Sequence, residues 1–308
     1  MPSPSALLSR RGILLAAAAV AALARPGATA HAQGGGDLAE QVARRIAQVP
    51  GARVGVAYVP LDGAPGLALD ADAEFHAAST MKVPVMVEVF RQAERGGAGL
   101  DQPVLLVNDF TSIADGSPFS VSPADDSDSS MYARIGERVP LRELVERMIV
   151  RSSNLATNAV IALADPVRVT ATLRSLGASR MRVLRGVEDG KAYEQGLNNT
   201  ATAADLAAVL RAIAEDRAAS PAACAAMRSV LERQEFNDEI PAGLPPGTRV
   251  AHKTGQITAV LHDAAIVYPP RRAPYVLVVL TSDVPDERTA RALIVDVSRL
   301  VWEAHGAR

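Results

Sequence analysis

The sequence predicts an α+β protein of the α/β-sandwich type, on two observations. Strand-like segments lie near both ends of the 308-residue chain, at 53–61, 67–71, 249–253, 259–268 and 275–282. The middle of the chain instead repeats apolar residues at helical spacing. Strands that enclose a run of helices suggest one antiparallel sheet built from both ends and flanked by the terminal helices. We therefore expect an all-helical lobe inserted into this chain, with an active site between the two lobes.

The expected lobes follow from this order of elements. The α/β lobe covers about 37–78 and 245–308, and the helical lobe about 79–235. Helices are expected at 37–49, 79–94, 141–150, 154–164, 166–176, 203–215, 220–232 and 285–305. Two irregular stretches, 109–138 and 185–202, interrupt the helical lobe.

Local signals mark the ends of several elements. Asp37 is a suitable N-cap for the first helix, and Asp62-Gly63 forms a turn between the first two strands. Pro84 falls in the first turns of the helix at 79–94, where a missing N–H costs little. The acidic run 125–130 lacks the glycine-turned loop and terminal glutamate of a calcium site, so we expect a solvated loop.

The composition is that of a folded globular enzyme. Hydrophobic residues make up 48% of the chain, and the net charge of −2 gives no reason to expect a nucleic acid or an anionic membrane as partner. The single cysteine, Cys224, cannot form an intramolecular disulfide and is expected to be a small buried residue on a helix.

The first 32 residues have the pattern of an export signal. Ser9-Arg10-Arg11 precedes an apolar run from Ile13 to Ala24, and Ala30-His31-Ala32 supplies an A-x-A cleavage site. The paired arginines favour a twin-arginine signal, with an ordinary secretory signal as the alternative. We expect an exported protein, periplasmic or secreted, whose mature form starts near Gln33 and has no membrane anchor.

Lysine is rare in this chain and its positions are informative. The only lysines are Lys82, Lys191 and Lys253, although the chain is rich in arginine. Lysine can lose its proton when buried, whereas arginine cannot. Lys82 follows Ser79 by three residues, so both side chains lie on one face of a helix. A desolvated lysine there could take the serine proton and create a nucleophile, but alone the pattern more often marks a helix cap with a surface lysine.

Two further motifs lie downstream. Ser152 and Asn154 open a helix, where an N-cap is the simplest interpretation, and Lys253-Thr254-Gly255 lies on a late strand. Together, S-x-x-K, S-x-N and K-T-G in this order resemble the signature of the class A β-lactamase and penicillin-binding protein superfamily. Phe75, four residues before Ser79, also fits, and the resemblance covers about 37–308.

The resemblance implies a role for each motif residue. Ser79 would form an acyl-enzyme with a β-lactam, with Lys82 as base or proton relay. Ser152 would pass a proton to the leaving nitrogen, and Asn154 would hold Lys82 and a substrate amide. The substrate carboxylate would bind Lys253 and Thr254, with Gly255 allowing close approach. The oxyanion hole would consist of the N–H groups of Ser79 and Gln256. No cofactor or metal is implied, and a monomer is expected.

The sequence departs from this family pattern at the deacylating glutamate. Arg185 takes the place of a loop arginine, and Asn199 falls where an aspartate usually pairs with it. Glu188 is then one residue late, whereas Glu194 reproduces a local E-x-x-L-N spacing far from Arg185. We favour Glu188. If neither glutamate activates water, the acyl-enzyme would be long-lived, as in a D,D-peptidase, an esterase or a drug-sensing penicillin-binding protein.

Other departures concern the pocket. Gln256 and Ile257 follow the K-T-G motif where the family often has small residues, so they could narrow or redirect the substrate pocket. His262 falls where many members have a carboxylate-binding arginine, with a packed strand histidine as the alternative. Tyr132 is a candidate aromatic gate at the cleft mouth. A Ser-His-Asp hydrolase or a zinc enzyme is disfavoured, because G-x-S-x-G and paired histidine motifs do not occur.

Overall fold

The computed structural model describes residues 36–284 and 286–307 of the chain. The export signal predicted for residues 1–32 lies outside the described residues. Within the described part, no helix combines the length and apolar character needed to cross a bilayer.

The sheet is antiparallel and is assembled from both ends of the chain, as predicted. Its five strands have the order β2-β1-β11-β10-β9. The strands are β1 (Arg53–Pro60), β2 (Leu67–Leu69), β9 (Arg249–Ile257), β10 (Val260–Tyr268) and β11 (Tyr275–Ser282). N-terminal β1 pairs with C-terminal β11 along its whole length, from Arg53 opposite Ser282 to Pro60 opposite Tyr275. This pairing joins the two chain segments that precede and follow the inserted helices.

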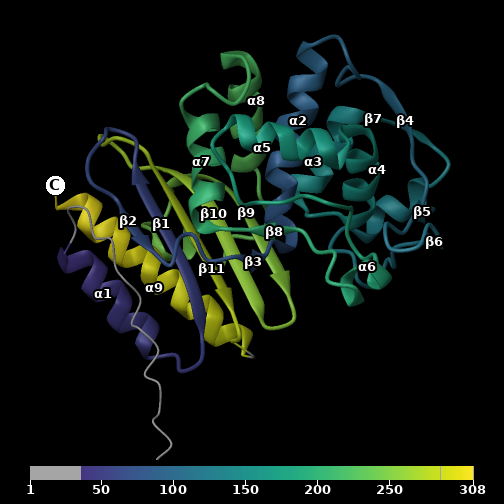
Figure 1. Ribbon diagram of the computed structural model, residues 1–308. Helices are drawn as coiled ribbons and strands as arrows, with labels where there is room; N and C mark the ends of the chain where they lie inside the picture. Colours follow the sequence, from purple (N-terminus) through teal and green to yellow (C-terminus); the bar gives the residue numbers. More distant parts are fainter. Residues whose placement is uncertain (1–35, 285, 308) are drawn as a thin grey trace, which may run out of the picture.

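Both faces of the sheet are covered, which explains the continuous apolar run of β11. Leu277 and Val279 pack on one face, beneath α1 (Gly36–Ala47) and α9 (Glu287–Gly306) (Figure 1). Val276 and Val278 pack on the other face, in the core shared with the inserted helices. Because side chains alternate along a strand, a sheet buried on both sides needs apolar residues at every position.

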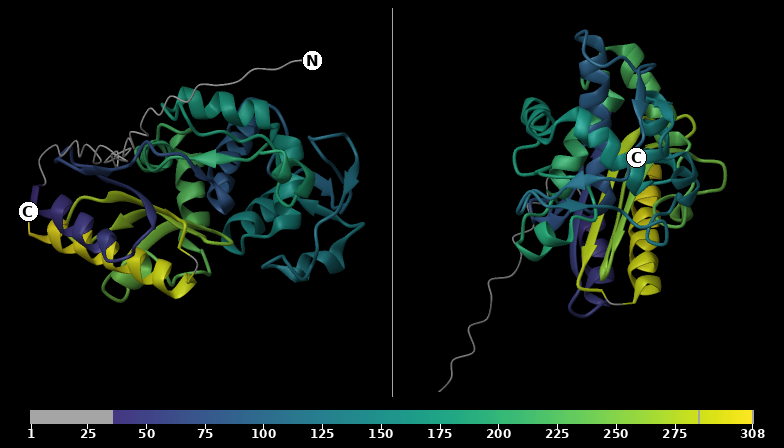
Figure 2. Two further views of the ribbon diagram at one scale, coloured as in Figure 1. Left: turned by 60° about the horizontal axis from the view of Figure 1, so that its bottom comes forward. Right: turned by 90° about the vertical axis from the view of Figure 1, so that its right-hand side faces the viewer.

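The inserted helices form the second half of the molecule (Figures 1 and 2). They are α2 (Lys82–Glu94), α3 (Leu141–Val150), α4 (Asn154–Ala164), α5 (Pro166–Ser175), α7 (Ala203–Ala214) and α8 (Pro221–Glu232), with the short α6 (Gly190–Glu194). Cys224 is fully buried on α8, as predicted. The 3-10 helices are η1 (Ala78–Met81), η2 (Ser129–Arg134) and η3 (Pro241–Gly243).

Short strand pairs fix the connecting segments. β3 (Phe75–His76) pairs with β8 (Thr200–Ala201), β4 (Pro103–Leu105) with β7 (Arg138–Pro140), and β5 (Phe110–Thr111) with β6 (Pro118–Phe119). The β3–β8 pair joins the segment before Ser79 to the end of the loop that carries Glu188.

Two expectations were wrong in detail. Ser79 does not open an α-helix but lies in η1, and the α-helix begins at Lys82. The acidic run 125–130 is not simply a solvated loop, because Asp126 and Asp128 are buried and are bonded to α4 and α3, respectively. Within the described residues, no group of three His, Cys, Asp or Glu side chains is arranged to hold a metal ion.

Candidate active site

Ser79 lies where η1 meets strand β9. Ala78, directly before it, has a positive φ of 44°, a conformation that L-residues rarely adopt. A Cβ on Gly255 of β9 would lie only 3.2 Å from the Ser79 backbone nitrogen and 3.1 Å from Thr80 Cγ2. Glycine at 255 therefore lets the strand pass directly beside the Ser79 backbone.

Lys82 is fully buried one turn beyond Ser79. Its Nζ donates to the Ser152 carbonyl at 2.6 Å, to Ser152 Oγ at 3.1 Å and to Asn154 Oδ1 at 3.1 Å. Burial, and then the nearby Lys253, hold the Lys82 pKa well below its usual value. A lysine with a lowered pKa gives up its proton more readily than an exposed one, and the 152–154 segment fixes its position.

Ser152 and Asn154 come from the junction between α3 and α4. Ser152 has a positive φ of 56°, and Ser153 caps α4 by accepting from the Ala156 N–H at 3.2 Å. The sharp turn directs Ser152 Oγ to Lys82, while the Asn154 amide contacts both Lys82 and Glu188.

Glu188 faces the same site from the loop at 185–202. It accepts a hydrogen bond from Asn154 Nδ2, and its own φ is 60°. Asn158 of α4 holds the preceding residue by accepting from the Val187 N–H at 2.7 Å and donating to its carbonyl at 3.1 Å. Partial desolvation raises the Glu188 pKa above its ordinary value. Glu194 is exposed at the end of α6 and does not line this cavity.

The loop pairing expected for Arg185 differs from the one observed. Asn199 Oδ1 accepts from the Leu184 N–H at 2.7 Å and from the Arg185 N–H at 3.2 Å. The Arg185 guanidinium instead donates to Asn198 Oδ1 and to the Leu197 carbonyl. Asn199 thus supports the loop backbone, because a neutral amide both donates and accepts.

Lys253 is buried beside the site, on β9. Its Nζ donates to the Thr254 carbonyl at 3.0 Å. Burial lowers the Lys253 pKa to about 7, against the opposing charges of Asp263 and Glu239. Asp263 is itself bonded to the buried His252 at 3.0 Å. The lysine charge therefore depends on pH within the neutral range.

A cavity of about 680 Å³ brings these groups together. The predicted residues that line it are Ser79, Ser152, Asn154, Glu188, Thr254 and Gln256. Gln256 and Ile257 are exposed at the end of β9, and Gln256 Nε2 donates to Glu287 of α9 at 2.7 Å. Gln256 is thus held toward α9, and Ile257 forms part of the cavity wall.

Three other residues considered in the sequence analysis, His262, Tyr132 and Lys191, do not line the cavity. His262 is fully buried, and its Nδ1 accepts from the Thr281 N–H while its Nε2 contacts the His76 carbonyl at 2.9 Å. Burial lowers the His262 pKa to about 4, so it is a packed neutral histidine. Tyr132 Oη donates to Asp126 at 3.1 Å and does not line the cavity. The aromatic residues that line the cavity are Phe236 and Tyr193. Lys191 forms a surface ion pair with Asp115 at 2.8 Å.

Asp126 and Asn158 are site-supporting residues that the sequence analysis missed. Asn158 had a sequence signal, since it follows Asn154 by one helical turn on the face toward the loop. Asp126 had none beyond its charge, because its partners include backbone N–H groups of a distant helix.

The fold and these motifs define a class A β-lactamase-like serine hydrolase. The sequence model of the Beta-lactamase enzyme family matches residues 37–305, so the chain belongs to this family. A β-lactamase of Streptomyces albus G is 30% identical over 98% of this chain and 99% of its own.

Solved structures agree. A β-lactamase from Sphaerobacter thermophilus has a TM-score of 0.76 and 29% identity, covering 87% of this chain and 98% of its own. A protein named PBP-A has a TM-score of 0.76 and 25% identity, covering 88% and 96%.

Proposed function

We propose that this protein is a serine β-lactamase that opens the β-lactam ring through an acyl-enzyme on Ser79. The observation that carries this proposal is the buried Lys82, one turn beyond Ser79, whose Nζ is held by Ser152 and Asn154. A buried lysine with a lowered pKa can act as a base where an exposed one cannot.

Acylation uses the serine and lysine motifs. Ser79 Oγ attacks the lactam carbonyl as its proton passes to Lys82, and a bond forms between Oγ and the carbonyl carbon. The carbon–nitrogen bond of the ring then breaks, and the nitrogen receives the proton through Ser152 Oγ, which lies 3.1 Å from Lys82 Nζ. The N–H groups of Ser79 and Gln256 stabilise the oxyanion.

Substrate binding uses the other side of the cavity. Lys253 and Thr254 bind the substrate carboxylate, and Asn154 binds a side-chain amide. Gly255 lets β9, which carries Lys253 and Thr254, pass close to Ser79, since a Cβ at this position would crowd the Ser79 backbone.

We assign the deacylation step to Glu188. Its carboxylate lines the cavity and is fixed through Asn154 and the Asn158-bound loop. It takes a proton from water as the water oxygen attacks the acyl carbon. The bond from that carbon to Ser79 Oγ then breaks, and the proton is returned to Ser79 Oγ, which restores the hydroxyl and the Glu188 carboxylate. Glu194 does not line the cavity and is therefore not assigned this role.

The test is hydrolysis of a chromogenic cephalosporin by the purified protein. Ser79→Ala is expected to reduce turnover by at least about 10⁴-fold, since the nucleophile is lost. Mass spectrometry over time should show an adduct on Ser79 that forms and disappears. An adduct that persists would contradict β-lactamase turnover and favour a penicillin-binding protein with slow deacylation.

The cellular setting belongs to the same proposal. The relatives are bacterial β-lactamases, and residues 1–32 have the pattern of an export signal. The mature domain, from about residue 33, would act as a monomer in the periplasm or outside the cell.

A further inference from the structure

Asp126 is a buried carboxylate placed between the reacting residues and the start of α4. Its two oxygens accept five hydrogen bonds, from Asp128 N–H, Tyr132 Oη, Ser153 Oγ, Asn154 N–H and Leu155 N–H. In the described part of the chain no basic side chain forms an ion pair with it. Burying a carboxylate without an ion pair costs free energy unless hydrogen bonds compensate its oxygens, as these five do.

Those bonds complete the N-terminus of α4. The first N–H groups of a helix lack partners within the helix. Here Asp126 Oδ2 accepts from Asn154 and Leu155, both at 2.9 Å, and Ser153 Oγ accepts from Ala156 at 3.2 Å. The carboxylate therefore supplies from a distant loop what a helix cap usually supplies from its own sequence, and its charge suits the positive end of the helix.

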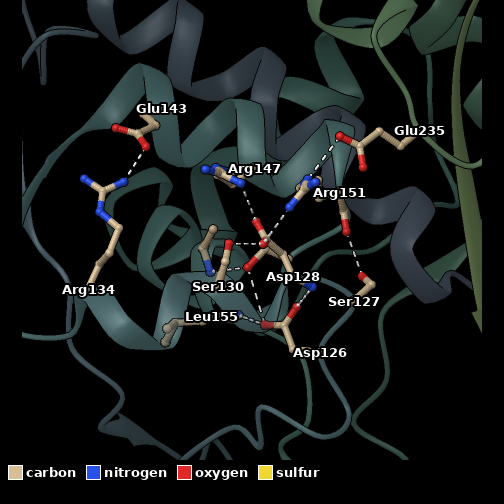
Figure 3. Close-up of polar contacts among 12 residues, drawn as sticks. Asp126, Ser127, Asp128, Ser130, Arg134, Glu143, Arg147, Arg151, Leu155 and Glu235 are labelled. Atoms are coloured by element: carbon tan, nitrogen blue, oxygen red, sulfur yellow. Dashed lines mark hydrogen bonds and ion pairs between the residues drawn. The ribbon is translucent and has the colours of Figure 1, made fainter.

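The same loop is bound to α3 by a second aspartate. Figure 3 shows Asp126 directed to Leu155, and Asp128 directed to Arg147 and Arg151. Asp128 accepts from Arg147 at 3.2 Å and from Arg151 at 3.3 Å. Ser127 Oγ also donates to the Arg151 carbonyl at 2.7 Å. The loop thus bridges the end of α3 and the start of α4, on either side of Ser152.

We propose that Asp126 is a positioning residue of the reaction, which holds the Ser152–Asn154 segment so that Lys82 and Glu188 keep their reacting geometry. Ser152 has a left-handed conformation that needs support from its surroundings. Asn154 is bound through its backbone to Asp126 and through its side chain to both Lys82 and Glu188. This inference rests on the proposed function only for its kinetic consequence.

The charge of Asp126 acts on the same groups. Lys82 is faced by Lys253 from β9, by Asp126 and by Glu188, and the two carboxylates favour its ammonium form. Loss of the Asp126 charge would therefore lower the Lys82 pKa further. It would also remove a charge that raises the Glu188 pKa. Both changes lower the pKa of a group that must be deprotonated to act. They therefore move the acid limb of the pH–rate profile toward lower pH.

The test compares Asp126→Asn with Asp128→Asn. Both residues are buried carboxylates of one loop, but Asp128 contacts no residue of the 152–154 segment. The rate of Ser79 labelling by a fluorescent penicillin is measured against pH, which needs no turnover. Asp126→Asn should reduce labelling at least about tenfold and move its acid limb to lower pH, whereas Asp128→Asn should keep the limb in place. An unmoved limb in Asp126→Asn, or an equal shift in both variants, would overturn the proposal.

Amide hydrogen exchange separates this result from the proposed function. Exchange at Asn154 and Leu155 should accelerate in Asp126→Asn and not in Asp128→Asn, whether or not the wild type binds penicillin. Unchanged protection would contradict the proposed contact. If the wild type is never labelled, the proposed function fails while the exchange result still decides the positioning role.

A double variant covers the case in which Asp126→Asn does not fold. Asp126→Ala with Ser153→Asp moves the carboxylate to the N-cap position itself, into the space that Asp126 leaves. Aspartate is a favoured N-cap, so folding and labelling should recover relative to Asp126→Ala. A folded double variant without recovery would show that a carboxylate at this helix end is not what the site requires.

Discussion

At the scale of single residues, the site depends on two buried lysines with lowered pKa values. Lys82 and Lys253 are both fully buried, whereas the third lysine, Lys191, is at the surface. Burial penalises the ammonium form and lowers the pKa of both lysines, to about 7 for Lys253. Their functions differ because Lys82 must lose its proton to act, while Lys253 must keep it.

The pH dependence of substrate affinity follows from Lys253. Its pKa of about 7 means that its positive charge is present below pH 7 and lost above it. KM for an anionic β-lactam is therefore expected to rise above pH 7, by up to about tenfold for each further pH unit. Lys253→Arg, which stays protonated, should flatten this rise. A KM that stays constant from pH 6 to about 9 in the wild type would contradict the prediction.

Glu188 and Glu194 give a matched pair for the deacylation step. Glu188→Gln is expected to slow deacylation about 10²–10⁴-fold, because a general base is removed, while acylation changes little. Glu194→Gln should behave as the wild type, since Glu194 is exposed and outside the cavity. Quenched-flow mass spectrometry of the acyl-enzyme measures both steps. Rapid deacylation in Glu188→Gln would place the base elsewhere.

At the scale of elements, strongly patterned segments could be predicted and tertiary contacts could not. The helices at 141–150 and 154–164 and the strand at 275–282 have the predicted bounds, because their apolar periodicity is strong. The strand from 249 was expected to end at Lys253 but continues to Ile257, since pairing with β10 outweighs the weak pattern of Thr254-Gly255-Gln256.

Candidate site residues show the same division. Ser79, Lys82, Ser152, Asn154 and Lys253 could be named from motif spacing, and the fold brings them around one cavity or directly beneath it. A run of polar residues, by contrast, usually indicates a solvent-exposed loop. Asp126 is buried because it accepts from the first N–H groups of α4, which have no partner within the helix. This helix begins 28 residues later in the chain. No local sequence pattern indicates such a tertiary contact.

The loop that carries Glu188 depends on one glycine. A Cβ on Gly186 would lie 2.2 Å from Asn158 Oδ1, the atom that holds Val187. Gly186→Ala is expected to displace the loop and slow deacylation at least about tenfold, with a smaller effect on acylation. Gly190→Ala is the control, because a Cβ there meets nothing within 4 Å. Equal effects of the two substitutions on deacylation, measured by mass spectrometry, would count against this account.

At the scale of the whole molecule, one core joins the sheet to the inserted helices. The buried cluster that includes Val276 and Val278 of β11 extends without a break to Cys224 and Met227 of α8. A second cluster lies between the sheet and α1 and α9. Because both clusters share the same strands, loosening of one half of the molecule should destabilise the other.

Cys224 makes this coupling measurable, since the chain has no other cysteine. Its side chain is fully buried, and its Sγ lies 3.6 Å from the Ala219 carbonyl. If the core unfolds as one unit, a thiol reagent should reach Cys224 only in globally unfolded molecules. Labelling should then be slower than that of a free thiol by about 10³-fold or more, and its urea midpoint should match that of far-UV circular dichroism. Cys224→Ala provides the unlabelled control. Labelling well below the urea midpoint would instead mean that α8 opens separately from the sheet.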